Sequence, residues 1–86
     1  MAAKIMVVED DGIIRVHLQN VLKKNGYQVC GMASSGPQAV ALALETRPDL
    51  ILMDIVLEGP MDGIEASAEI HTQADIPIIY LTAYAD

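Results

Sequence analysis

The sequence has no phenylalanine, no tryptophan and a single cysteine, Cys30, among its 86 residues. One cysteine excludes a disulfide bond within the chain, and no group of Cys and His has the spacing of a zinc site. Basic residues are scarce as well: five Lys and Arg stand against twelve Asp and Glu, which gives a net charge of −7. Because nucleic acids and anionic membranes attract positively charged surfaces, we do not expect this chain to bind either of them directly.

Long hydrophobic runs are also missing. No apolar stretch approaches the roughly 18 residues that span a bilayer, and Lys4 is followed by only four apolar residues before the acidic segment that begins at Glu9. The N-terminus therefore does not read as a signal peptide, and with the single cysteine this predicts a soluble cytoplasmic protein. Hydrophobic residues still make up 52% of the chain, which predicts one small folded domain over residues 1–86 rather than a disordered tail.

Short apolar runs predict the strands. The runs at 5–8, 50–53 and 76–81 are apolar at nearly every position, as in strands that are covered on both faces of a parallel sheet. A fourth run at 27–33 contains more polar residues, which is typical of a strand nearer the edge of a sheet.

Helical patterns lie between these runs. The first helix should end at Asn25-Gly26, the second should begin near Ser35 and end at Arg47-Pro48, and the third should span about 62–73. The first helix carries one apolar stripe, which we expect to face the core: Ile14, Leu18, Val21 and Leu22. The order β-α-β-α-β-α-β predicts an α/β fold with a doubly wound parallel sheet.

Acidic and hydroxyl side chains follow the predicted strands. Glu9, Asp10 and Asp11 come after the first run, Asp54 after the third and Thr82 after the last. In open α/β sheets ligands bind at this edge, and converging carboxylates require either a proton or a cation. Oxygen ligands favour Mg²⁺, and an aspartate, a divalent cation and a hydroxyl make a minimal phosphoryl-transfer site. Taken alone, each of these residues is explained more simply as a helix cap or as a polar group at the end of a strand. Their occurrence together at the strand ends of one sheet favours the phosphoryl-transfer site.

Four segments of the sequence resemble the receiver domain of two-component response regulators. They are residues 7–11 after the first strand, 48–54 through the third, 61–65 at the start of the third helix, and 76–83 through the fourth strand. The resemblance covers essentially the whole chain. It implies a flavodoxin-like, three-layer α/β/α fold with strand order 2-1-3-4, in which strand five and helices four and five of the family are missing.

The resemblance also implies a role for each acidic residue. Asp54 corresponds to the phosphoacceptor, which takes a phosphoryl group from a sensor histidine kinase, a phosphotransfer protein or a small phosphodonor. Asp10 and Asp54 are expected to bind Mg²⁺ directly, with Mn²⁺ as an alternative ion. The backbone carbonyl of Val56 would be a further ligand, and Glu9 would act through a metal-bound water.

Residues after the fourth strand correspond to the family's switch elements. Thr82 would supply the hydroxyl that bonds the phosphoryl oxygen, and the N–H of Ala83 would contact the same group. Val56 and Tyr84 occupy the positions that tune dephosphorylation. Because they are apolar and bulky here, we expect them to hinder water and to give a long-lived phosphoryl form.

The sequence departs from the family in two places. The turn 57–61 is about one residue longer than the commonest form, and the chain stops at Asp86, before the family's phosphoryl-binding lysine. We predict that no basic side chain replaces that lysine at the carboxyl ends of the strands. Without strand five, the fourth strand would be an open apolar edge, so we expect either a longer native chain or a homodimer or swapped dimer through this edge.

Two classes of function remain open at the level of sequence. The first is a phosphorylation-controlled switch, which is not a turnover enzyme. The alternative is a degenerate or truncated receiver that pairs with partner proteins without being phosphorylated, which the missing lysine favours and the intact acidic residues oppose. A phosphatase is a more distant reading, because Val56 stands where aspartate phosphatases carry a second carboxylate.

Overall fold

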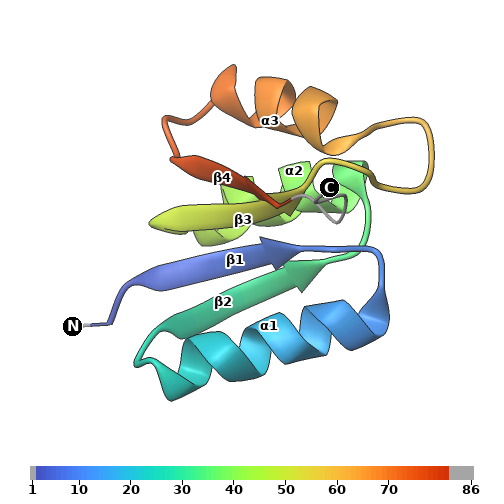
Figure 1. Cartoon of the computed structure of the whole chain (residues 1–86). Helices are drawn as coiled ribbons and strands as arrows, with labels where there is room; N and C mark the ends of the chain where they lie inside the picture. Colours follow the sequence, from blue (N-terminus) through green and yellow to red (C-terminus); the bar gives the residue numbers. More distant parts are fainter. Residues whose placement is uncertain (1, 82–86) are drawn as a thin grey trace.

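The computed structural model describes residues 2–81, which form a four-stranded sheet with three helices packed on it (Figure 1). All three pairs of neighbouring strands are parallel, and the strand order is β2-β1-β3-β4. The strands are β1 Lys4–Val8, β2 Gln28–Ala33, β3 Leu50–Asp54 and β4 Ile78–Leu81; the helices are α1 Gly12–Lys24, α2 Gly36–Thr46 and α3 Gly63–His71. The predicted element order and strand order are confirmed.

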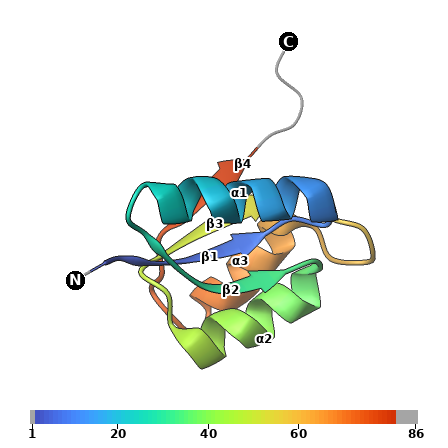
Figure 2. The same cartoon turned by 90° about the horizontal axis from the view of Figure 1, so that it is seen from below.

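The sheet lies between two helical layers. Figure 2 shows α1 on one face of the sheet and α2 with α3 on the other. None of the helices in the described part of the chain is long and apolar enough to cross a membrane.

The hydrophobic core fills the space between the sheet and the α2–α3 layer. Large side chains from β1 and β3 meet small ones from the two helices, and the members of this core with no exposed surface are Met6, Val8, Ile51, Met53, Ala39, Ala43, Ala66 and Ile70. Each fully buried large side chain contributes about 1.5–3 kcal/mol relative to an exposed one. The alanines Ala39, Ala43 and Ala66 thus place small side chains between the two helices and the sheet.

Helix α1 is less covered than its apolar stripe predicts. No residue of α1 is buried, and Ile14 and Val21 are each 42% exposed. The helix packs on β1 and β2. Among residues 2–81 no second helix lies beside it over β3 and β4, so the flank of the stripe faces solvent. The apolar stripe is therefore only partly covered by the sheet.

Capping residues set the helix boundaries as predicted in most places. The side chains of Asp11, Ser35 and Asp62 each accept a hydrogen bond from a backbone N–H in the first turn of a helix. The second helix ends at Thr46, and the residue that caps its C-terminus, Arg47, has a left-handed φ of 47°. Strand β4 begins at Ile78 rather than at residue 76, because the intervening Pro77 has no N–H to give to the sheet.

Strand β4 forms one edge of the sheet in the part of the chain that the structure describes. Ile79 and Tyr80 are exposed by 52% and 42%. An apolar edge of this kind favours pairing with another strand. Self-association through this edge stays a prediction.

Ser67 on α3 provides a test of the packing around this helix. Its Oγ is, among the described residues, the one buried side-chain polar atom without a hydrogen-bond partner. Removing a buried, unpaired hydroxyl removes its desolvation penalty, so Ser67→Ala should raise the free energy of unfolding by about 1 kcal/mol. Urea denaturation measures the difference.

The neighbouring position supplies the converse control. Ala66 has no exposed surface, so Ala66→Ser should place a new hydroxyl in the core and lower the free energy of unfolding. Destabilisation by Ser67→Ala would contradict this account, since it would mean that the hydroxyl is hydrogen-bonded.

Candidate functional site

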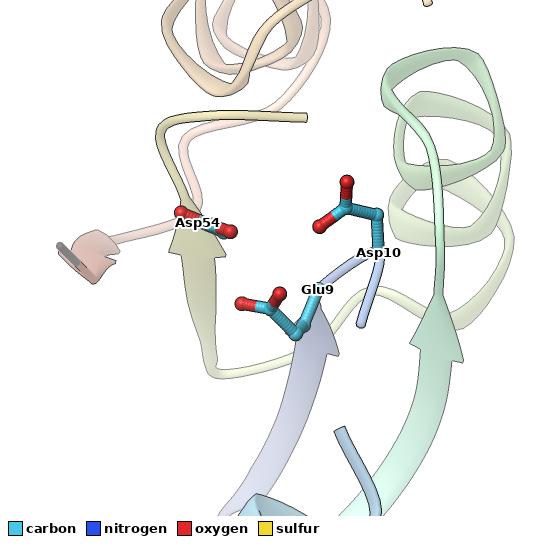
Figure 3. A group of neighbouring side chains, drawn as sticks. All are labelled: Glu9, Asp10 and Asp54. Atoms are coloured by element: carbon cyan, nitrogen blue, oxygen red, sulfur yellow. The ribbon is translucent and has the colours of Figure 1, made fainter. Parts of the chain in front are cut away.

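Three carboxylates meet where β1 and β3 end. The two strands are neighbours, with Val8 in register with Met53, so the residues that follow them lie side by side. Figure 3 shows the side chains of Glu9, Asp10 and Asp54 turned toward one another across the two strand ends. Each offers one oxygen, and these oxygens lie within 4.8 Å of one another. The sequence prediction that Glu9, Asp10 and Asp54 converge is confirmed in geometry.

Backbone N–H groups orient all three side chains. The N–H of Val56 donates to Oδ1 of Asp54 (3.2 Å), and the N–H of Asp11 donates to Oε1 of Glu9 (3.1 Å). The N–H of Glu58 donates to Oδ2 of Asp10 (3.3 Å). The last bond joins the loop after β3 to the loop after β1. Both loops therefore share in placing the acidic cluster.

The cluster is electrostatically unfavourable without a counter-charge. Glu9 is 5% exposed and Asp54 is 7% exposed. Burial, together with the neighbouring carboxyl groups of Asp54 and Asp10, raises the pKa of Glu9 from 4.5 to about 7, although the Asp11 N–H opposes the rise. A cation bound here would relieve both the repulsion and the cost of burial.

The donor set fits a hard divalent cation. All three side chains offer carboxylate oxygen, and neither sulfur nor imidazole lies in the cluster. Mg²⁺ and Mn²⁺ prefer oxygen ligands. Asp10 is only half-buried, so the cluster opens to solvent on its side, and Val56 beside it is 54% exposed.

Gly63 brings the start of α3 against the end of β3. A Cβ at this position would overlap the carbonyl oxygen of Asp54 and lie 2.9 Å from Cα of Ile55. The N–H of Gly63 donates to the carbonyl of Ile55 (2.9 Å). Asp62 and Glu65 close the loop with a capping box. The Asp62-Gly63 pair was noted in the sequence, but its close approach to Asp54 was not predicted.

Arg15 is the residue that the sequence analysis missed. Its guanidinium donates from Nη1 to the carbonyl of Glu9 (2.7 Å), so a basic group does lie at this end of the sheet. This bond is to a backbone carbonyl, so the prediction that no basic side chain replaces the family's phosphoryl-binding lysine stays a prediction. Helical side chains lean toward the N-terminus of their helix, and Arg15 stands one turn after the cap Asp11. The spacing between Asp11 and Arg15 is the sequence signal that could have predicted a basic group near Glu9.

The remaining predicted site residues, Thr82, Ala83 and Tyr84, lie outside the described residues. The roles expected for them therefore stay predictions.

The comparisons with known proteins all point to the same family. The model of the response regulator receiver domain matches residues 5–86. The transcriptional regulatory protein PdtaR of Mycobacterium tuberculosis is 38% identical over 82 residues, which are 95% of this chain and 40% of that protein. The chain thus spans less than half the length of this curated relative.

Solved structures with the same fold include receiver domains. The signal receiver domain of a modulated diguanylate cyclase from Desulfovibrio desulfuricans has a TM-score of 0.91 and 36% identity, covering 98% of this chain and 67% of that one. The anti-anti-sigma factor PhyR from Bartonella quintana, in complex with the anti-sigma factor NepR, has a TM-score of 0.87 and 32% identity, covering 100% and 36%.

Substitution of Gly63 tests the close approach of α3 to Asp54. Gly63→Ala should lower the free energy of unfolding by about 2–3 kcal/mol, because the new methyl group meets rigid backbone. Gly12 is a matched control, since it also begins a helix after a capping Asp but has room for a methyl group, with Nη2 of Arg15 at 3.5 Å. Equal stability of both variants in urea denaturation would refute the close-approach argument.

The raised pKa of Glu9 predicts a pH dependence of stability in the absence of divalent cations. The folded chain holds the proton more tightly than the unfolded chain, so this stabilisation is complete below pH 4.5 and is lost as the pH rises to about 7. The loss should be about 3 kcal/mol in urea denaturation.

Glu9→Gln is the control for this pH dependence. It should remove most of the slope, because its side chain does not titrate, and Mg²⁺ should restore stability to the wild-type chain near pH 7.5. Identical slopes in the wild type and Glu9→Gln would count against the assignment.

Proposed function

The chain belongs to the response regulator receiver domain family, and on that premise we propose that it is a phosphorylation-controlled switch whose phosphoacceptor is Asp54. The observation that carries the proposal is the position of Asp54. It is the last residue of β3, it is nearly buried, and one of its carboxylate oxygens lies within 4.8 Å of carboxylate oxygens of Glu9 and Asp10.

The chemistry of the transfer follows from this arrangement. A carboxylate oxygen of Asp54 attacks the phosphorus of a phosphohistidine, the P–O bond forms as the P–N bond breaks, and the leaving imidazole takes up a proton from solvent. The N–H of Val56, bonded to Oδ1, orients the attacking carboxylate. The product is an aspartyl phosphate, formed without any further catalytic base.

A divalent cation has a defined place in this proposal. Asp10, Asp54 and the backbone carbonyl of Val56 would hold Mg²⁺ or Mn²⁺ directly, and Glu9 would act through water. When bound, the ion neutralises the charge that collects on the transferred phosphoryl group. The oxygen-only donor set supports this assignment.

The readout of phosphorylation would use the residues after β4. Phosphorylation adds about −1.5 to −2 charges at Asp54. We propose that the hydroxyl of Thr82 and the N–H of Ala83 bond the phosphoryl oxygens, and that Val56 and Tyr84 slow its hydrolysis. The exposed Val56 beside the cluster is consistent with a part in limiting access of water.

We propose a sensor histidine kinase or a phosphotransfer protein as the partner, in the cytoplasm. That a relative is found in complex with a protein, NepR, supports a role in protein interaction more generally. The second candidate function is an interaction module that is not phosphorylated. It is favoured by the missing phosphoryl-binding lysine, because Arg15 donates to the carbonyl of Glu9 and not to a carboxylate of the cluster.

The experiment that separates the two candidates is phosphorylation by acetyl phosphate with Mg²⁺, read by intact mass. The switch predicts one added phosphoryl group that requires Mg²⁺, is absent in Asp54→Asn, and decays over minutes rather than seconds. Asp49→Asn is a control at the other end of β3. A folded wild-type chain that gains no phosphoryl group under these conditions would leave the interaction module as the function.

A further inference from the structure

The main chain of Glu9 is hydrogen-bonded on both sides. Its N–H donates to the carbonyl of Ala33 at the end of β2 (3.0 Å), and its carbonyl accepts from Nη1 of Arg15 (2.7 Å). That carbonyl belongs to the peptide group that joins Glu9 to Asp10. Its orientation sets the direction in which the chain turns, and therefore where the Asp10 side chain points.

The first turn of helix α1 holds the guanidinium next to this peptide group. Asp11 caps the helix by accepting from the N–H groups of Ile13 (2.9 Å) and Ile14 (3.2 Å), and its carbonyl accepts from the N–H of Arg15 (2.9 Å). A Cβ at Gly12 would lie 3.5 Å from Nη2 of Arg15, an ordinary contact, so the guanidinium lies beside the first residue of the helix. The arginine is thus fixed relative to the loop by its own helix.

The guanidinium of Arg15 has two opposing effects on a cation bound at the acidic cluster. Coulomb repulsion between the guanidinium and a bound divalent cation weakens cation binding. A hydrogen bond that orients a ligand strengthens it. The two effects have opposite signs, so a measurement of cation affinity shows which one governs Arg15.

We propose that Arg15 is a positioning residue for the acidic cluster: by bonding the carbonyl of Glu9 it fixes the peptide before Asp10 and aims the Asp10 carboxylate at Asp54. The inference rests on the proposed function in one respect, because it takes Asp10 as a cation ligand. It adds a role for a residue on α1 that does not itself touch the cation or the phosphoryl group.

Titration with Mn²⁺, followed by electron paramagnetic resonance, tests the inference. Arg15→Met should weaken Mn²⁺ binding about tenfold, the lower end of what such supporting groups contribute, although it removes a positive charge. Arg15→Lys keeps the charge and one donor, and should recover part of the affinity. If Arg15→Met binds Mn²⁺ as tightly as the wild type or more tightly, the positioning role is wrong.

Arg47 offers a matched control. Its guanidinium also donates to a backbone carbonyl, that of Leu44 (3.1 Å), but at the C-terminal end of α2. Arg47→Met removes the same charge and the same kind of bond away from the cluster, so it should leave Mn²⁺ affinity unchanged. An equal loss in Arg47→Met would show that overall charge or stability, and not position, sets the affinity.

A double-mutant cycle with Asp10→Asn identifies the route of the effect. If Arg15 acts by aiming Asp10, then adding Arg15→Met to Asp10→Asn should weaken Mn²⁺ binding by less than twofold. An undiminished tenfold effect would overturn the route through Asp10.

Circular dichroism selects folded variants, and Arg15→Gln replaces Arg15→Met if the latter unfolds. Failure of the folded wild type to bind Mn²⁺ would instead overturn the proposed function, and this inference with it.

Discussion

The structure depends on the meeting of three carboxylates at the ends of two neighbouring parallel strands. Glu9 and Asp54 are nearly buried there, and burial beside other carboxyl groups raises the pKa of Glu9. Such a cluster is stable only because the surrounding backbone supplies N–H donors and because a cation or a proton offsets the repulsion. Under the proposed function the same unfavourable arrangement would bind a divalent cation, so stability and function would oppose each other at this edge of the sheet.

Three other features of the fold lie next to those strand ends. Ala39 and Ala43 of α2 and Ala66 of α3 pack in the core beneath the sheet with no exposed surface. Gly63 then allows α3 to begin directly against the carbonyl of Asp54. On the opposite face, α1 packs loosely on the sheet but contributes Arg15 to the loop after β1. The tightly packed layer therefore sets the position of Asp54, and the loosely packed layer reaches the peptide before Asp10.

Local sequence signals predicted the elements well where a single residue decides the outcome. Asp11, Ser35 and Asp62 begin the helices because their side chains accept hydrogen bonds from the first turn, a local interaction. Burial was predicted less well. The stripe on α1 has the spacing of a core-facing helix, yet Ile14 and Val21 are 42% exposed, because what covers a stripe is decided by neighbouring elements and not by spacing.

By itself, the sequence determined the element order and the acidic residues at the strand ends, since both follow from short-range patterns and from the rule that ligands gather at the carboxyl edge of a parallel sheet. The family resemblance supplied the strand order. Only the tertiary structure decided how close the carboxylates come, that Gly63 must lack a side chain, and that Arg15 reaches back to the carbonyl of Glu9. These features depend on distances between segments far apart in the chain or on the direction of a long side chain, which residue spacing alone does not specify.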